Sequence, residues 1–259
     1  MQSAHLSKDE VIELSLQKMQ RSLEVVERGL REKVALTCQI LFSRGHDSGL
    51  AGQITARTQN GKYLTQQLGL GFDEITPANL LEVDRDLGVI EGDGMPNPAN
   101  RFHSWIYDKR PDVRCIVHTH ALHTTALSML GIPLEISHMD ACLLYGDVAF
   151  LEQWPGIPVG NEEGRIISEI LGDKRAALLA HHGMIVAGRS VEEACVLAVQ
   201  FERAAQVQLM ALGAGGIAAI PPALGLEARE WLRQGKRYGV LFDYYVRRLQ
   251  RSARGPLFI

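Results

Sequence analysis

Apolar residues recur along this chain with two different periods, one helical and one extended. Between residues 22 and 44 they return every third or fourth position, which predicts a helix that stops at Gly45. Similar helical patterns mark later segments, at 102–109, 121–130, 162–171, 190–212 and 227–251. Short apolar runs between turn-forming residues predict strands, at 52–57, 62–65, 80–83, 114–117, 148–151 and 176–180. Strands and helices therefore alternate along most of the sequence.

The connections between these strands limit how they can pair. Asn60-Gly61 lies between two extended segments and is typical of a tight hairpin, which joins antiparallel strands. Such links are too short for the crossover that parallel neighbours need. We therefore expect an α/β protein with a mixed sheet covered by helices on both faces. No repeat divides the chain, so we expect an N-terminal tail, one domain and a C-terminal helical extension, at 1–20, 21–213 and 214–259.

Histidines stand at the ends of two of the predicted strands. His118 and His120 end the first, and side chains two positions apart on an extended chain project from the same face. His181 and His182 end the second, just before Gly183, and only one of these neighbours is expected to join the first pair. Three imidazoles with a fourth position open are the ligand set of a catalytic zinc site. A lone His-x-His is more often an ordinary polar pair, but its recurrence on a second strand favours a metal site.

Composition argues against several other classes of protein. The formal net charge of -3 gives no electrostatic basis for binding nucleic acid. No segment approaches the length of a membrane span, and charged residues such as Lys8 and Asp9 interrupt the region where a signal peptide would be apolar. The four cysteines are scattered without a Cys-x-x-Cys pair, which is typical of a reducing compartment. We expect a cytoplasmic protein with neither nucleic-acid nor membrane partners.

An ordered series of motifs resembles the class II aldolase and adducin-head family. The motifs lie between residues 23 and 212 and are GQITAR at 52–57, EIT at 74–76, FHSWIY at 102–107, RPDV at 110–113, VHTH at 117–120 and HHG at 181–183. The resemblance implies a three-layer αβα sandwich around a mixed, largely antiparallel sheet, and a homotetramer with active sites between subunits. It also implies that His118, His120 and His182 hold a divalent metal, most often zinc, with manganese or another transition metal as alternatives.

The sequence departs from the sugar-phosphate aldolases of that family where those enzymes hold phosphate and move protons. Their Pro-Ser-Ser-Glu block is replaced by NPAN at 97–100, which leaves Ala99 in the position of the glutamate. Their phosphate loop is also altered, with Gln53 in place of asparagine and Leu68 in place of threonine. These changes indicate an unphosphorylated substrate, and the Asn-Pro-Ala variant resembles the adducin-head branch and its bacterial relatives.

Without that glutamate, other groups must transfer protons if the chain is an enzyme. Asp140 is the first candidate, and His123, on the helix after the first histidine pair, is the second. Asn100 is expected to orient substrate or water near the metal. His103, in contrast, is expected to be a buried structural histidine.

These observations predict a metal-dependent lyase that acts on a small, unphosphorylated carbonyl or carboxylate compound. Aldol cleavage and decarboxylation share an enediolate, which a bound cation stabilises as a Lewis acid. The alternative is a non-catalytic, adducin-like oligomeric interaction module that has kept the fold and lost turnover.

Overall fold

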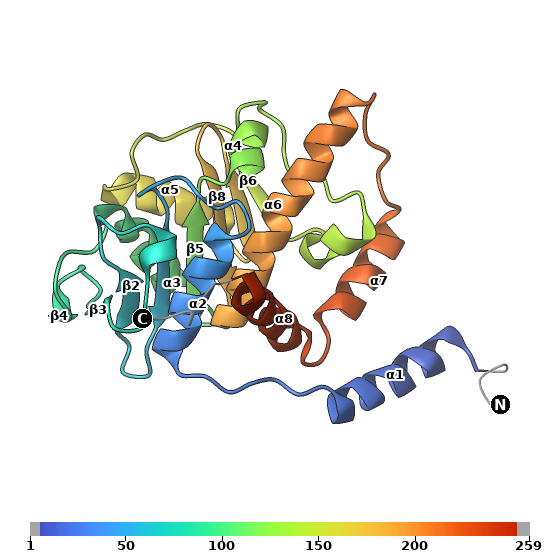
Figure 1. Cartoon of the computed structure of the whole chain (residues 1–259). Coiled ribbons are helices and arrows are strands. Elements are labelled where there is room, and N and C mark those ends of the chain that lie inside the picture. The colour runs from blue at the N-terminus through green and yellow to red at the C-terminus, as the bar shows by residue number, and fades with distance from the viewer. Residues whose placement is uncertain (1–5, 253–259) are drawn as a thin grey trace.

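A sheet of eight strands runs through the molecule (Figure 1). The computed structural model describes residues 6–252. The strands are β1 (Gln53–Arg57), β2 (Tyr63–Gln66), β3 (Leu80–Val83), β4 (Val89–Glu91), β5 (Cys115–Thr119), β6 (Val148–Leu151), β7 (Ala176–Leu179) and β8 (Gly183–Gly188). They lie in the order β4-β3-β2-β1-β5-β8-β7-β6. All neighbours are antiparallel except β6 and β7, so the predicted mixed, largely antiparallel sheet is confirmed.

Helices cover both faces of this sheet (Figure 1). The α-helices are α1 (Lys8–Ser22), α2 (Leu30–Phe42), α3 (Arg101–Lys109), α4 (Leu122–Ser128), α5 (Asn161–Leu171), α6 (Val191–Gly213), α7 (Pro222–Arg233) and α8 (Arg237–Ser252). Short 3-10 turns are η2 (Phe72–Glu74), η3 (Pro98–Asn100) and η4 (Met139–Leu144). The helices α2, α6 and α8 pack on one face, and α3 and α5 pack together on the other.

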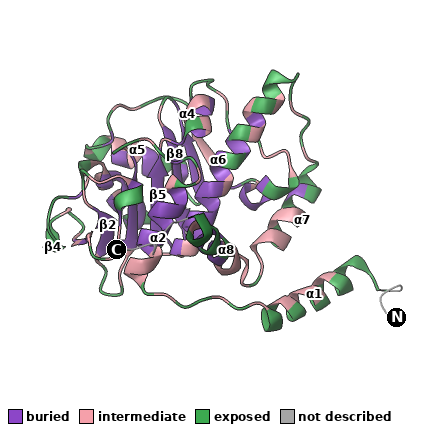
Figure 2. Cartoon of the chain, viewed as in Figure 1, coloured by how far each residue is buried: buried purple, intermediate pink, exposed green. Residues whose placement is uncertain are grey.

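Each face of the sheet has its own apolar core. Val117 of β5 belongs to the core under α2 and α6, whereas its neighbour Ile116 belongs to the core under α3 and α5. This division follows from the two-residue period of a strand, which sends successive side chains to opposite faces. Figure 2 shows the buried residues concentrated in the sheet and the inward sides of the helices. The three-layer αβα arrangement is therefore what the alternating pattern predicted.

The helix predicted over residues 22–44 is wrong in its first third. The chain is extended from residue 23 to 29, and α2 begins only at Leu30. Long-range contacts account for the difference, because the Val26 N–H donates to Asp243 Oδ2 at 2.9 Å and Arg28 forms an ion pair with the same carboxylate. The periodicity of a local segment carries no information about a distant partner such as Asp243 on α8.

The secondary structure differs from the sequence prediction at other places as well. The single helix expected at 227–251 is two helices, because the chain turns at Gly235, whose φ is 65°. The strands β4 and β8 were not predicted.

The two ends of the described chain differ in how they are packed. Helix α1 has no buried residue and projects from the body, with Lys8 paired to Glu227 of α7 (Figures 1 and 2). Helix α8 instead buries Phe242, Tyr245 and Val246 in the core that α2 and α6 share. Among residues 6–252, no helix combines the length and apolar character that a membrane crossing requires.

Candidate metal centre

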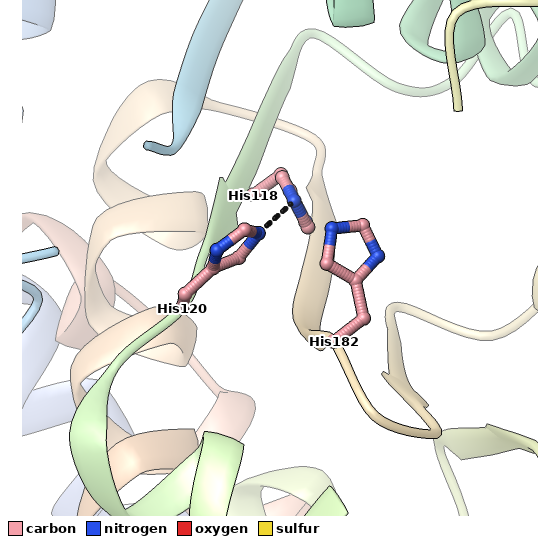
Figure 3. A group of neighbouring side chains, drawn as sticks. All are labelled: His118, His120 and His182. Atoms are coloured by element: carbon pink, nitrogen blue, oxygen red, sulfur yellow. Dashed lines mark hydrogen bonds between the residues drawn. The ribbon is translucent and has the colours of Figure 1, made fainter. Parts of the chain in front are cut away.

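Three histidines converge at one end of the central strands (Figure 3). His118 is on β5, His120 follows the end of that strand, and His182 is in the turn between β7 and β8. They meet because β5 and β8 are antiparallel neighbours, with Thr119 opposite Met184. The nitrogen atoms that the three side chains offer all lie within 4.8 Å of one another, and His118 Nε2 is 3.0 Å from His120 Nε2.

The structure separates His182 from its neighbour His181. His181 is exposed and has a φ of 56°, so the pair forms a tight turn rather than two successive strand positions. The His182 ring centroid lies 4.7 Å from that of His118 and 4.5 Å from that of His120. His182 is therefore the member of the pair that joins the cluster.

Two glycines allow the backbone to approach this cluster closely. A Cβ on Gly183 would lie 2.4 Å from the Thr119 carbonyl oxygen and 3.1 Å from the His120 ring. Gly52, at the start of β1, has a φ of 107°, and a Cβ there would lie 3.1 Å from the His118 carbonyl oxygen. Side chains at these positions would push apart the strands that hold the histidines.

Hydrogen bonding and burial together favour neutral imidazoles. His118 Nδ1 lies 2.8 Å from the Met184 carbonyl oxygen, which can only accept, so this nitrogen carries the proton and Nε2 keeps its lone pair. Burial, and then the neighbouring histidines, hold the pKa of His118 well below its usual value. Burial also lowers the pKa of His120, and it lowers that of His182 to about 4. The cluster is thus kept in the protonation state that metal ligands require.

The arrangement fits a divalent metal ion. Two nitrogen ligands on a tetrahedral zinc ion lie about 3.3 Å apart, close to the spacing of His118 and His120. The carbonyl that holds His118 Nδ1 is the kind of partner that orients metal-ligating histidines. Among the described residues, no carboxylate joins the cluster.

Polar side chains extend from the triad along the α3 face of the sheet. Gln53 is directly opposite His118 in the pairing of β1 with β5, so both side chains share a face. Three buried atoms along this face have no hydrogen-bond partner, namely Gln53 Oε1, Asn100 Oδ1 and His103 Nε2. Unpaired buried polar atoms are costly unless something binds to them. Beside the triad, they are where a polar substrate or water would be held.

Asn100 and His103 are each fixed by a threonine. Asn100 Nδ2 donates to Thr65 Oγ1 at 3.0 Å, and His103 Nδ1 lies 2.8 Å from Thr55 Oγ1. Both residues are almost fully buried, and burial lowers the pKa of His103 to about 3. The structure thus places Asn100 on the same face as the three histidines. It also brings in Gln53, whose position opposite His118 depends on a strand register that the sequence alone does not give.

His123 lies on the other side of the sheet from the triad. Its backbone N–H and its ring Nδ1 both bond Glu202 Oε1 of α6, at 2.9 Å and 2.7 Å. The other oxygen of Glu202 accepts from the backbone and hydroxyl of Thr124. The buried carboxylate therefore caps the start of α4 and fixes the His123 ring on the α6 side.

Asp140 is also separate from the triad within one chain. It lies on η4 with 65% of its side chain exposed, and its ion-pair partner is Arg203 of α6 at a distance of 4.0 Å. Neither predicted proton donor, Asp140 or His123, contacts the three histidines in the described part of the chain.

Comparison with solved structures identifies the fold. An L-fuculose 1-phosphate aldolase from Glaciozyma antarctica superposes with a TM-score of 0.78 and 28% identity, over 86% of this chain and 89% of that one. An aldolase II superfamily protein from Pseudomonas syringae gives 0.80 and 25%, over 91% and 98%. The fold is therefore that of the class II aldolases.

Sequence comparison leads to the family. The profile of the family described as Class II Aldolase and Adducin N-terminal domain matches residues 32–209, and the chain belongs to this family. The L-fuculose phosphate aldolase of an Escherichia coli strain is 30% identical over 218 residues, 83% of this chain and 97% of the relative. The decarboxylase NovR of Streptomyces niveus is 32% identical over 177 residues, 67% of this chain and 66% of the relative. Named relatives thus include both an aldolase and a decarboxylase.

Proposed function

We propose that this protein is a cytoplasmic, metal-dependent lyase that cleaves a carbon–carbon bond in a small, unphosphorylated carbonyl or carboxylate compound. The convergence of His118, His120 and His182 as neutral imidazoles carries the proposal. Zinc is the preferred ion, because three imidazoles with an open fourth position suit it. The four cysteines are all free and buried, in keeping with a reducing compartment.

His118, His120 and His182 would hold the divalent ion, which would supply Lewis-acid chemistry toward a substrate carbonyl. The residues of the chain itself bind the substrate and orient the histidines. Met184 fixes the His118 tautomer through its carbonyl, and Asn100, held by Thr65, keeps one oxygen free toward the substrate. Gln53, opposite His118, offers a second free oxygen. Two acceptor oxygens beside the triad suit a substrate that presents hydroxyl groups.

The same region argues against a phosphorylated substrate. Ala99 packs against the core under α3 and supplies no charge, and no carboxylate stands with the triad in the described residues. The buried atoms without a partner on this face are two amide oxygens and one nitrogen of a neutral imidazole, and none of them belongs to a cation. A phosphate needs donors.

We further propose a homotetramer in which a neighbouring subunit completes the site. Within one chain, Asp140 and His123 do not contact the triad, so either could transfer a proton only to a substrate bound by another copy. Asp140 is the better placed of the two, because its carboxylate is mostly exposed whereas His123 is held by Glu202. Light scattering is expected to give about four times the chain mass of 28.6 kDa.

The decisive experiment compares two adjacent histidines. Purified wild-type protein is expected to hold about one divalent ion per chain, and a panel of hydroxy and keto acids and free ketoses is screened for release of carbon dioxide or aldehyde. His182→Asn should abolish both metal and turnover, whereas His181→Asn should leave both intact. A protein without stoichiometric metal, or a His182→Asn variant with full turnover, would rule out the proposal.

Subunit mixing tests the shared site. Asp140→Asn and His120→Ala are each expected to be inactive alone. If Asp140 acts across the boundary, mixed oligomers of the two variants contain some sites with both native residues and regain part of the activity. No recovery in verified mixed oligomers would exclude Asp140 as a donor between subunits.

A further inference from the structure

A cavity lies away from the three histidines of its own chain, and residues of α8 form the largest part of its wall. It has a volume of about 380 Å³, is partly open, and has residues of α1, η4, α6, α7 and α8 in its wall. Most of its wall is apolar, with side chains that include Leu23, Leu143, Val196, Leu232, Val240 and Leu241. The size and lining are those of a site for a small organic molecule.

Two polar groups in this wall have atoms without a partner. Arg237 Nε and Gln200 Oε1 are both buried and make no hydrogen bond. The Arg237 guanidinium stacks on the Trp231 ring, with its central carbon 4.4 Å from the ring centroid. One of its terminal nitrogens is 3.5 Å from Met19 Sδ, which is a weak acceptor. Burial lowers the pKa of Arg237, which shows how little its surroundings compensate the charge.

Three of the other poorly exposed arginines of the chain pair with carboxylates, whereas Arg57, like Arg237, does not. Arg28 pairs with Asp243, Arg175 with Glu193, and Arg233, four residues before Arg237, with Asp147. Among the described residues, Arg237 has no such carboxylate. The buried Nε–H of this guanidinium has lost its water without gaining a partner, so an external anion would gain a charge-assisted hydrogen bond there.

From these observations we infer that the cavity binds a small amphiphilic carboxylic acid, with its carboxylate on Arg237 and its apolar body among the leucines and valines. Gln200 offers an acceptor for a hydroxyl or N–H group on the same ligand. Arg247, exposed on α8 at the same cavity, adds positive charge, while Asp140 at the wall faces Arg203. The ligand is therefore acidic at one end and aliphatic or aromatic along its length.

Calorimetric titration of the metal-free full chain with octanoate tests this site, because removing the metal prevents a carboxylate from binding at the triad. Octanamide has the same shape without the charge and serves as the matched ligand. Octanoate should bind at least about tenfold more tightly than octanamide, as a charge-assisted contact requires. Equal binding, or no binding of octanoate at millimolar concentration, would overturn the inference.

A pair of variants on the same helix supplies the second arm. Arg237→Met keeps an unbranched stem and removes the charged guanidinium, and Arg251→Met makes the same change outside the cavity. Arg237→Met should weaken octanoate binding by about tenfold or more and raise the Tm of the ligand-free protein, because an uncompensated charge is removed. Arg251→Met should change neither. Octanoate binding that survives Arg237→Met, or a ligand-free Tm that falls, would contradict the assignment.

Discussion

Histidines on the two sides of β5 show how partners decide the role of the same side chain. On the α3 side, His118, His120 and His182 face one another with no carboxylate among them in the described residues, and the Met184 carbonyl leaves His118 Nε2 unprotonated toward the other two rings. On the α6 side, His123 is tied to the carboxylate of Glu202, and His46 Nδ1 lies 2.7 Å from Thr119 Oγ1. The first group is arranged to bind a cation and the second to hold α4 and the chain after α2 in place. Sequence proximity, as between His120 and His123, does not distinguish the two.

Removing a ligand from the α3 side should have the largest effect. His182→Asn is expected to lower the affinity for a divalent ion by about a hundredfold or more, because an imidazole is replaced by a weak amide ligand. His181→Asn keeps a residue that tolerates positive φ and should retain full affinity. Competition with a metal-binding dye measures both affinities. Equal affinities in the two variants would show that His182 contributes no more to metal binding than His181 does.

On the α6 side, a substitution should lower the free energy of unfolding and leave the metal content unchanged. Glu202→Gln replaces a carboxylate that accepts four hydrogen bonds, and is expected to lower the free energy of unfolding by about 2 to 4 kcal/mol. Glu162→Gln alters an exposed pair with Arg165 and should change it by less than about 0.5 kcal/mol. Urea unfolding gives both values, and metal content at 25 °C should stay at the wild-type level in each variant. Loss of metal from Glu202→Gln would show that the two sides are not independent.

Gly183 begins β8 and lies against the end of β5, so its substitution should lower both the stability and the affinity for metal. Gly183→Ala forces a Cβ against the Thr119 carbonyl and is expected to cost about 1 to 3 kcal/mol and to weaken metal binding. Gly213→Ala, at the end of α6 with no atom within 4 Å of the added Cβ, is the control and should not destabilise. The same urea and dye measurements apply. If Gly183→Ala leaves the free energy of unfolding and the metal affinity unchanged, then β5 and β8 accommodate the added Cβ at no cost in free energy.

The pH dependence of the metal-free protein should be the subtlest difference. The pKa of His182 falls from 6.5 to about 4 and that of His103 to about 3, and the pKa of His118 is also lowered. The unfolded chain therefore binds protons first as the pH falls, and stability should decrease from about pH 6.5 to pH 4 by up to about 1.4 kcal/mol per pH unit for each such group. Urea unfolding across this range should give a smaller slope for His182→Asn than for His181→Asn. Identical slopes would show that His182 titrates normally in the fold.

The sequence predicted the fold and the family because those depend on local patterns. The strand at 148–151 and the helix after Ser190 were predicted to within a residue, since their periodicity and capping are local. Residues 23–29 were not, because their extended backbone depends on Asp243 of α8.

The candidate site was only partly predictable for the same reason. His118 and His120 share a face by strand geometry, and the structure brings His182 to them. The place of Gln53 opposite His118, and of Glu202 behind His123, requires the register of the strands and the packing of α6. These contacts join residues that are distant in the sequence, so the spacing of residues along the chain does not predict them.

The contact between Val26 and Asp243 also bears on how the protein is made. The two residues are 217 positions apart, so a ribosome releases the extended segment long before α8 exists to accept its hydrogen bond. Until then, Val26 and the Arg28 charge must stay in water or with a chaperone. The sheet and α2 can form earlier, but residues 23–29 reach their final position only when α8 is present. The segment that leads into α2 is thus made long before the helix that fixes it.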